Sequence, residues 1–293
     1  MPSFTRRRYQ ASRAAAAQQA GVWPRVVAVV QQAHVWLRAA LVALQFLTRL
    51  PLRIEPSPTA SEIGLSLACY PIVGLALGTM LWGLALLTSR LPALLGAAIV
   101  LAAWVLMTGA LHIDGLADTA DAWVGGHGDP ERTLSIMKDP RSGPIALAVV
   151  NCLLLLKFAA IAALAALTAT HFHEAPWHDP RLAAGCILPP LLARAAIPLL
   201  FAHTPYVRAQ GIAQDLAAHQ SRRVGALAIA LSVLGTLAAY RMLGAIALSA
   251  AAIAYGVVRS GLVRRLGGFT GDGAGALIEV IEAICLVAIA AAP

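Results

Sequence analysis

Apolar runs long enough to cross a lipid bilayer recur along most of this chain. A spanning helix needs roughly 20 apolar residues. Runs of about that length lie at 63–88, 91–111, 144–168, 182–201, 224–240, 242–258 and 274–292. Charged residues make up only 12% of the chain, against about 25% in typical soluble domains. We therefore predict an all-α fold, a polytopic integral membrane helix bundle with about seven spanning helices.

The N-terminal region differs from these runs. The segment 35–51 is shorter and contains Arg38 and Arg49, so we predict an interfacial N-terminal helix there. The residues before it are basic and contain no apolar core of a signal peptide. We therefore expect residues 1–30 to form a flexible basic cytoplasmic arm and residues 31–293 to form a single membrane-embedded domain.

Lysine and arginine are distributed unevenly between the two predicted sides of the membrane. If 35–51 does not span, one side receives 17 of the 22 Lys and Arg residues. The segments on that side are 1–62, 114–143, 202–223 and 259–273. The other side receives only Arg90, Arg181 and Arg241. Because cytoplasmic loops carry the excess of positive charge, we predict a multi-pass protein of the cytoplasmic (inner) membrane with a cytoplasmic N-terminus.

The net charge of +8 raises the question of a nucleic-acid partner. No basic face with interleaved aromatic residues accompanies that charge, so we expect the lipid bilayer as a partner and no nucleic acid. The four cysteines, Cys69, Cys152, Cys186 and Cys285, stand singly in apolar runs and indicate neither a zinc site nor a disulfide framework. A homo-oligomer remains open.

Three carboxylates follow the apolar run 91–111 directly. If that helix continues through residue 121, Asp114, Asp118 and Asp121 fall within an arc of about 60°, because successive residues turn by about 100°. Like charges four residues apart repel each other, and a divalent cation would offset that repulsion. Hard oxygen ligands suit Mg²⁺, which commonly binds carboxylates together with substrate phosphates. A solvated acidic helix end is the alternative interpretation.

A second acidic group, GGFTGDGAGALIEVIE (267–282), opens the last apolar run. It contains Asp272 between two glycines, followed by Glu279 and Glu282. Ionisable groups inside a spanning segment usually mark function, and glycines allow the backbone to approach a phosphate or metal closely. We therefore add Asp272 and Glu279 to the candidate metal ligands. We also expect the last spanning helix to pack beside the Asp114–Asp121 helix, so that the two acidic groups form one site.

Basic residues that could bind phosphate lie between and after the acidic groups. The loop 129–144 offers Arg132, Lys138 and Arg141 as phosphate-binding residues, with Asp139 as a further metal ligand or a base. An ordinary basic loop is the alternative.

Four further basic residues are candidates for the same role. Lys157 and Arg194 lie inside apolar runs and need anionic partners, either the carboxylates or a substrate phosphate. Arg208 and Arg265 serve either as topology signals or as part of the pocket. Carboxylates for a metal, basic groups for phosphates and a membrane frame together favour phosphoryl or phosphodiester transfer. The chain has no P-loop motif, which disfavours transport driven by nucleotide hydrolysis.

The spaced motifs of the chain resemble the cobalamin synthase family, the adenosylcobinamide-GDP ribazoletransferases. The resemblance runs over most of 44–286 as LQFLTRLP (44–51), YPIVGLALG (70–78), LMTGALHIDGLADTADA (106–122), ERTLSIMKDPRSG (131–143), LLLKFAA (154–160), YVRAQG (206–211) and RRLGGFTGDGAGALIEVIE (264–282). Ala122 stands where the family commonly has glycine, and Pro140 where it often has serine. These departures affect loop geometry rather than ligands.

The resemblance implies a specific reaction. In it, α-ribazole or its 5′-phosphate would attack the pyrophosphate of adenosylcobinamide-GDP, giving adenosylcobalamin or its 5′-phosphate and GMP. The family is Mg²⁺-dependent and membrane-embedded. By this resemblance Asp114, Asp118 and Asp121 would hold Mg²⁺, and Asp139 or Asp272 would complete a second metal position or accept a proton. The domain 31–293 is then catalytic.

Two other functions compete with this interpretation. A CDP-alcohol phosphotransferase has a related aspartate motif, but the sequence after Asp118-Thr-Ala-Asp121 departs from it. A cation-coupled transporter would also place carboxylates in the membrane. Transporters often contain repeated halves, and no internal repeat links the two acidic segments.

Overall fold

The structure of the protein is a computed structural model that describes residues 27–139, 141–170, 180–208 and 212–293. Its regular structure within these residues is helical, and the β-type contact found there is an isolated bridge between Tyr206 and Phe269. The prediction of an all-α bundle is confirmed. The predicted arm, residues 1–30, lies largely outside the described part of the chain, and the division into arm and membrane domain stays a prediction.

The helices follow the apolar runs closely. After an N-terminal helix at Val27–Leu47, they are α2 (Ala60–Leu87), α3 (Ala93–Thr108), α4 (Leu111–Gly125), α5 (Pro130–Ile136), α6 (Pro144–Thr170), α7 (Pro180–His203), α8 (Ile212–His219), α9 (Arg222–Leu266) and α10 (Gly271–Ala290). By length and hydropathy, six of the described helices could cross a membrane, and up to seven if the bent pair α3 and α4 forms one span. The chain is therefore a multi-pass membrane protein.

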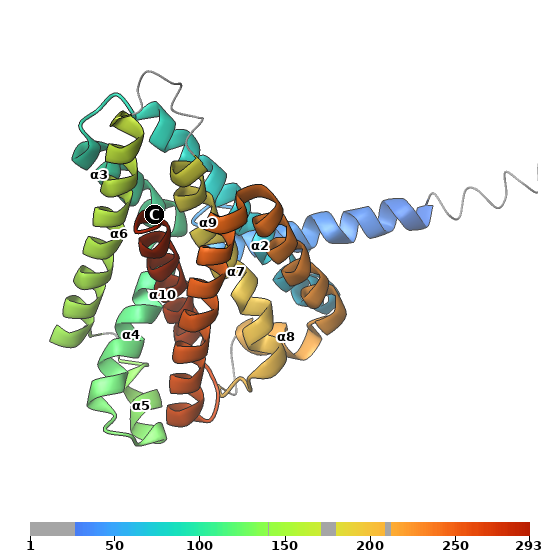
Figure 1. The fold of residues 1–293 in the computed structure, drawn as a ribbon. Helices are drawn as coiled ribbons and strands as arrows, with labels where there is room; N and C mark the ends of the chain where they lie inside the picture. Colours follow the sequence, from blue (N-terminus) through green and yellow to red (C-terminus); the bar gives the residue numbers. More distant parts are fainter. Residues whose placement is uncertain (1–26, 140, 171–179, 209–211) are drawn as a thin grey trace, which may run out of the picture.

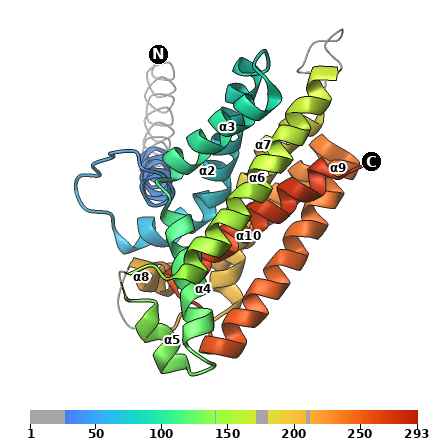
Figure 2. The same ribbon diagram turned by 90° about the vertical axis from the view of Figure 1, so that its left-hand side faces the viewer.

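Helices α7 and α10 form the centre of the bundle. They pack on each other, while α2, α4, α6 and α9 surround them (Figures 1 and 2). Helix α2 meets α7 through Gly74 and Gly78, four residues apart. A Cβ atom on Gly74 would lie 2.4 Å from the Pro190 carbonyl oxygen, and one on Gly78 would lie 2.6 Å from the Ile187 Cα. Small residues at this spacing let two membrane helices approach closely, which explains the glycines of YPIVGLALG.

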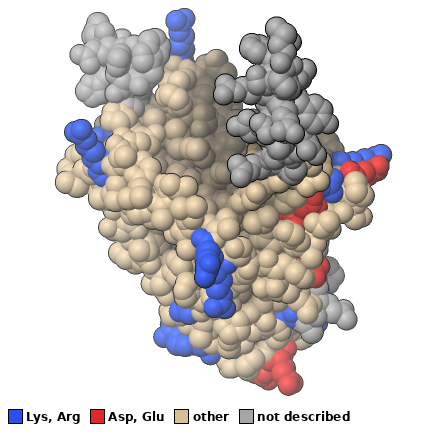
Figure 3. All heavy atoms as spheres, turned by 90° about the vertical axis from the view of Figure 1, so that its right-hand side faces the viewer, with Lys and Arg blue, Asp and Glu red and all other residues tan. Residues whose placement is uncertain are grey.

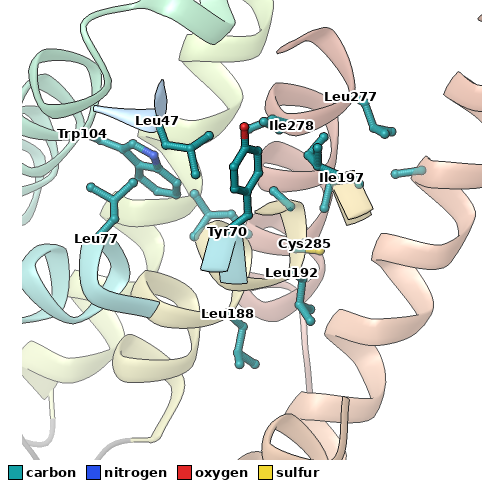
Figure 4. Packing of buried hydrophobic residues seen from close by; sticks show 14 of the residues in the cluster. Leu47, Tyr70, Leu77, Trp104, Leu188, Leu192, Ile197, Leu277, Ile278 and Cys285 are labelled. Carbon is teal, nitrogen blue, oxygen red and sulfur yellow. The ribbon is translucent and has the colours of Figure 1, made fainter. Parts of the chain in front are cut away.

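The core of the bundle is filled by aliphatic and aromatic side chains from different helices. In Figure 4, Leu77 and Trp104 lie on one side of Tyr70, while Leu192 and Cys285 lie on the other. The outer surface is also apolar. The face shown in Figure 3 is mostly uncharged, as expected for a surface that meets lipid.

The expected continuation of the 91–111 helix through residue 121 is wrong. The helix breaks at Gly109 and Ala110, which have φ values of 62° and 56°, and α4 leaves α3 at 86°. Two successive residues in the left-handed region cannot continue a right-handed helix. The predicted arc of the three aspartates does not depend on α3, because Asp114, Asp118 and Asp121 all lie within α4.

Helix α9 consists of two limbs that meet at Arg241, where φ is 44° and ψ is −110°. The two limbs fold into a hairpin (Figure 1). Gly244 permits the tight turn, because a Cβ atom there would lie 2.6 Å from the Thr236 carbonyl oxygen. This agrees with the predicted separation of the runs 224–240 and 242–258.

The N-terminal helix starts and ends earlier than the predicted 35–51. Its first part projects sideways from the bundle in Figure 1 instead of running alongside the other helices. Arg38 anchors its second part, because its guanidinium lies 2.6 Å from Glu62 Oε1 and donates to the Glu55 and Pro56 carbonyls. By length and hydropathy this helix could also span, so its interfacial position stays a prediction.

The segments assigned to one side of the membrane gather at one end of the bundle. Helices α5 and α8 and the start of α10 lie at the lower end in Figure 1. At the opposite end, Arg181 donates to the Pro293 carbonyl over 2.5 Å. Because α5, α8 and the start of α10 lie at the same end of the bundle, the structure agrees with the topology derived from the charges. The cytoplasmic location of that end stays a prediction.

We predict that these two ends lie on opposite sides of the membrane. Cys152 is the exposed native cysteine, so it is first replaced by serine. A membrane-impermeant thiol reagent should then label Ala218→Cys and Arg264→Cys only from the cytoplasmic side. Leu91→Cys, at the other end, should react only from outside. Labelling of Ala218→Cys and Leu91→Cys from the same side would contradict this topology.

Candidate active site

The carboxylates of α4 differ in their surroundings. Asp114 is exposed and Asp118 is half-buried one turn further along the same face. Burial, and then the nearby negative charges of Asp114 and Asp272, raise the pKa of the Asp118 carboxyl to about 6. Helix α4 lies after the bend, in the segment that the topology places outside the spans. The negative charges of Asp114 and Asp272 thus act on Asp118 in addition to its burial.

Asp121 has a different environment from the other two. Its Oδ2 accepts a hydrogen bond from the Gly143 backbone N–H at 2.5 Å, and its Oδ1 accepts one from Ala146 N–H at 2.9 Å. These N–H groups belong to the start of α6, where four backbone donors lack partners within the helix. Asp121 therefore caps α6 and joins it to α4.

The start of α10 holds Asp272 opposite α4. Thr270 caps this helix by accepting from the Gly273 N–H at 3.1 Å. Arg208 donates to Asp272 Oδ2 at 2.6 Å. The bridge between Tyr206 and Phe269 positions Arg208, because the Val207 N–H donates to the Phe269 carbonyl at 3.0 Å.

Glycines bring α4 and α10 into direct backbone contact. A Cβ atom on Gly115 would lie 2.8 Å from the Asp272 carbonyl oxygen, and one on Gly275 would lie 3.3 Å from the His112 Cα. A cavity of about 260 Å³ opens beside this contact and is lined by Asp114 and Asp272. The structure thus brings together two acidic groups that are about 150 residues apart in the chain, as the sequence predicted.

The loop candidates lie away from this cavity lining. Asp139 pairs with Arg141 at 2.6 Å, and the Arg141 side chain is 86% exposed. Hydrogen bonds from Arg141 lower the pKa of the Asp139 carboxyl to about 2. Arg132 and Lys138 are exposed on the same segment. Arg265 lies against the end of α4, where it donates to the Trp123 carbonyl at 2.7 Å.

Deeper in the bundle, four charged side chains form a buried ion network. Lys157 Nζ lies 2.6 Å from Glu279 Oε2 and 2.5 Å from Glu282 Oε2. Arg194 donates to the other carboxylate oxygen of Glu282, Oε1. The residues Arg194 and Glu282 are completely buried, and the other two are at most 3% exposed. Two positive and two negative charges balance each other within this network.

Two further side chains complete the surroundings of the network. Lys157 Nζ lies 4.7 Å from the ring centroid of Trp104, within range of a cation–π interaction. Arg194 Nη2 lies 3.5 Å from His112 Nδ1. His112 belongs to α4 and also lines the cavity. The network therefore connects α6, α7 and α10 to the start of α4.

This network changes the expected roles of three residues. Glu279, a candidate metal ligand, is engaged by Lys157 and is not among the residues that line the cavity. Lys157 and Arg194, candidate phosphate-binding residues, have carboxylate partners from α10. Of the two kinds of anionic partner that the sequence left open, the structure supplies the protein carboxylates, because a buried charge is costly unless it is paired.

The described residues do not form a complete metal site by themselves. No three His, Cys, Asp or Glu side chains in that part of the chain come close enough together to hold an ion. Mg²⁺ usually takes one or two carboxylates together with water and substrate phosphates. Asp114 and Asp118 fit that pattern, since their oxygens are hard ligands and a cation would relieve their repulsion from each other and from Asp272.

Three aromatic residues of the cavity were not predicted as site residues. Phe46, Tyr70 and Phe201 line it together with the acidic residues. Tyr70 places a hydroxyl in the run 63–88, but Ser66, Thr79 and Thr88 do the same, so the sequence does not single it out. Phe46 and Phe201 are indistinguishable in the sequence from core residues.

Comparisons with known proteins agree with one another. The family model described as cobalamin-5-phosphate synthase matches residues 39–290. An adenosylcobinamide-GDP ribazoletransferase of Stutzerimonas stutzeri is 51% identical over 253 residues, covering 85% of this chain and 96% of its own length. The protein of the same name in Pseudomonas aeruginosa PAO1 is 47% identical over 251 residues, with the same shares covered. No solved structure matches significantly.

We predict that the ion network stabilises the bundle through its charge balance. Arg194→Met should lower the free energy of unfolding in detergent by about 3–5 kcal/mol, because it leaves an excess buried negative charge. Adding Glu282→Gln to that variant should recover part of the loss, since one positive and one negative charge then remain. Arg141→Gln, at an exposed pair, is the control and should change little. A double variant that is less stable than Arg194→Met would contradict this account.

Proposed function

The chain belongs to the cobalamin-5-phosphate synthase family, and on that premise we propose that it is an adenosylcobinamide-GDP ribazoletransferase, a membrane enzyme of cobalamin assembly. The observation that carries the proposal is sequence identity. About half of the aligned residues are identical to those of relatives with that name, and the alignments cover nearly the whole length of those relatives. No feature of the described structure favours the two alternatives, a CDP-alcohol phosphotransferase or a cation-coupled transporter.

The proposed reaction is a displacement at phosphorus. A ribose hydroxyl of α-ribazole, or of its 5′-phosphate, forms a new P–O bond with the phosphorus that carries the cobinamide. The P–O bond to the bridging oxygen of the pyrophosphate breaks, and GMP leaves with that oxygen and the electron pair. The hydroxyl proton passes to a base. The product is adenosylcobalamin or its 5′-phosphate.

We propose that Asp114 and Asp118 would hold Mg²⁺ together with the substrate. Bound there, Mg²⁺ supplies positive charge that neutralises the pyrophosphate. Asp272 is better placed than Asp139 to accept the hydroxyl proton, because Asp272 lines the cavity and Asp139 does not. Asp121 acts through the backbone by fixing the start of α6 against α4.

Positive groups around the cavity mouth suit the pyrophosphate. Arg208 already engages Asp272 and can extend to a phosphate oxygen from the same position. The start of α10 presents backbone N–H groups next to Gly271, and among the described residues no atom beyond its neighbours in the chain lies within 4 Å of its Cβ position. Backbone N–H groups at a helix start favour anions. The exposed Arg132 and Lys138 could contact the rest of the nucleotide.

We predict that the purified protein releases GMP from adenosylcobinamide-GDP in detergent only when α-ribazole or its phosphate is present. Chelation with EDTA should abolish the release, and added Mg²⁺ should restore it. Mg²⁺ should also raise the melting temperature of the unmodified protein but not that of Asp114→Asn, a readout independent of turnover. Release without the ribazole substrate would indicate a hydrolase instead.

The three aspartates of α4 should respond differently to substitution. Asp118→Asn should lower kcat at least about 100-fold with little change in melting temperature, because it removes a metal ligand. Asp121→Asn should instead lower stability by about 1 kcal/mol, as expected for a weakened helix cap, and should retain measurable activity. Asp215→Asn, on the exposed face of α8, is the control. Equal kinetic effects at Asp118 and Asp121 would contradict the capping role.

A further inference from the structure

The cavity between α4 and α10 is lined by two chemically different sets of residues, which we call its polar half and its apolar half. One half is polar and contains Asp114, Asp272 and the glycine backbone at the start of α10. The other half is apolar and includes the rings of Phe46, Tyr70 and Phe201. The apolar half receives side chains from the N-terminal helix, α2 and α7, so three separate elements converge to form it. The proposed chemistry at the polar half leaves this aromatic half without a role.

Tyr70 is the unusual member of the apolar half. The residue is only 5% exposed, and its hydroxyl is a polar group within the otherwise apolar part of the lining. In Figure 4 the ring stands between Leu47 on one side and Ile197 and Ile278 on the other, and all of these residues line the cavity. Among the described residues, the Tyr70 hydroxyl oxygen does not belong to the fully buried polar atoms that lack a partner, so it is open to the cavity and free to bond to a ligand there.

The aromatic walls are held rigidly. Phe201 meets Phe269 edge to face, with ring centroids 4.8 Å apart, and Phe269 meets Tyr206 in the same way at 5.4 Å. This aromatic stack rests on the bridge that also positions Arg208. A ligand would therefore meet a preformed wall at Phe201, which reduces the entropy that binding must overcome.

The volume of the cavity distinguishes between the two proposed substrates. Pockets for drug-sized ligands measure about 300–1,000 Å³, and this cavity of about 260 Å³ lies just below that range. A corrinoid macrocycle is too large for it. A planar two-ring aromatic base fits, with its attached ribose reaching toward the polar half.

We propose that the apolar half of this cavity is the binding site for the aromatic base of the ribazole nucleoside. The Tyr70 hydroxyl donates a hydrogen bond to the free ring nitrogen of that base, while Phe46 and Phe201 contact its faces or edges. The ribose then points toward Asp114 and Asp272, where its hydroxyl meets the phosphorus. This inference rests on the proposed function and specifies which substrate occupies which part of the site.

Steady-state kinetics with each substrate varied separately test this assignment. Tyr70→Phe removes only the hydroxyl and should raise the KM for α-ribazole about ten-fold, the effect expected for one lost hydrogen bond. The KM for adenosylcobinamide-GDP should not change. Tyr240→Phe is the matched control, because Tyr240 lines a different cavity between α2, α7 and α9, and it should leave both values unchanged.

Calorimetric binding of α-ribazole alone to the full chain provides a readout independent of turnover. Tyr70→Phe and Phe201→Leu should each weaken that binding, and melting temperatures near that of the unmodified protein would show that both variants fold. Unchanged α-ribazole binding in both variants, or a raised KM for adenosylcobinamide-GDP, would overturn the assignment. Absence of GMP release by the unmodified protein would instead overturn the proposed function, so the two failures are distinguishable.

Discussion

The pairing of charges inside the bundle is the interaction on which the arrangement of the site depends. Lys157, Arg194, Glu279 and Glu282 would each be costly in a membrane interior, and together they are balanced. Their pairing requires α6, α7 and α10 to pack in one arrangement. Through His112 the same network reaches the first turn of α4. The first turn of α4 is therefore tied to the ion network deeper in the bundle.

The bend between α3 and α4 allows carboxylates to gather where phosphates can reach them. A straight continuation of α3 would not place α4 against the start of α10. The left-handed backbone at Gly109 and Ala110 turns the chain, and Gly115 then permits backbone contact with Asp272. The small residues between the aspartates of α4 thus serve the close approach of two helices as well as the chemistry.

Asp121 shows that a shared helical face does not imply a shared role. All three aspartates of α4 lie on one arc, but the chain returns after residue 142 to place two backbone N–H groups against Asp121. Asp114 and Asp118 have no such competing donors from α6 and remain beside Asp272. The acidic cluster therefore consists of a structural residue and a proposed metal-binding pair, supported by a carboxylate from another helix.

The sequence by itself determined the helical membrane fold, the positions of most of its apolar helices, the break at Arg241 and the helical face of the aspartates, because length, hydropathy and helical period are local properties. It also predicted that the two acidic groups meet, since buried carboxylates need partners. Only the tertiary structure decided which partners they have. Glu279 pairs with Lys157, Asp121 caps α6, and Tyr70 lines the cavity, because these outcomes depend on contacts between helices that are distant in the chain and leave no periodic signal in it.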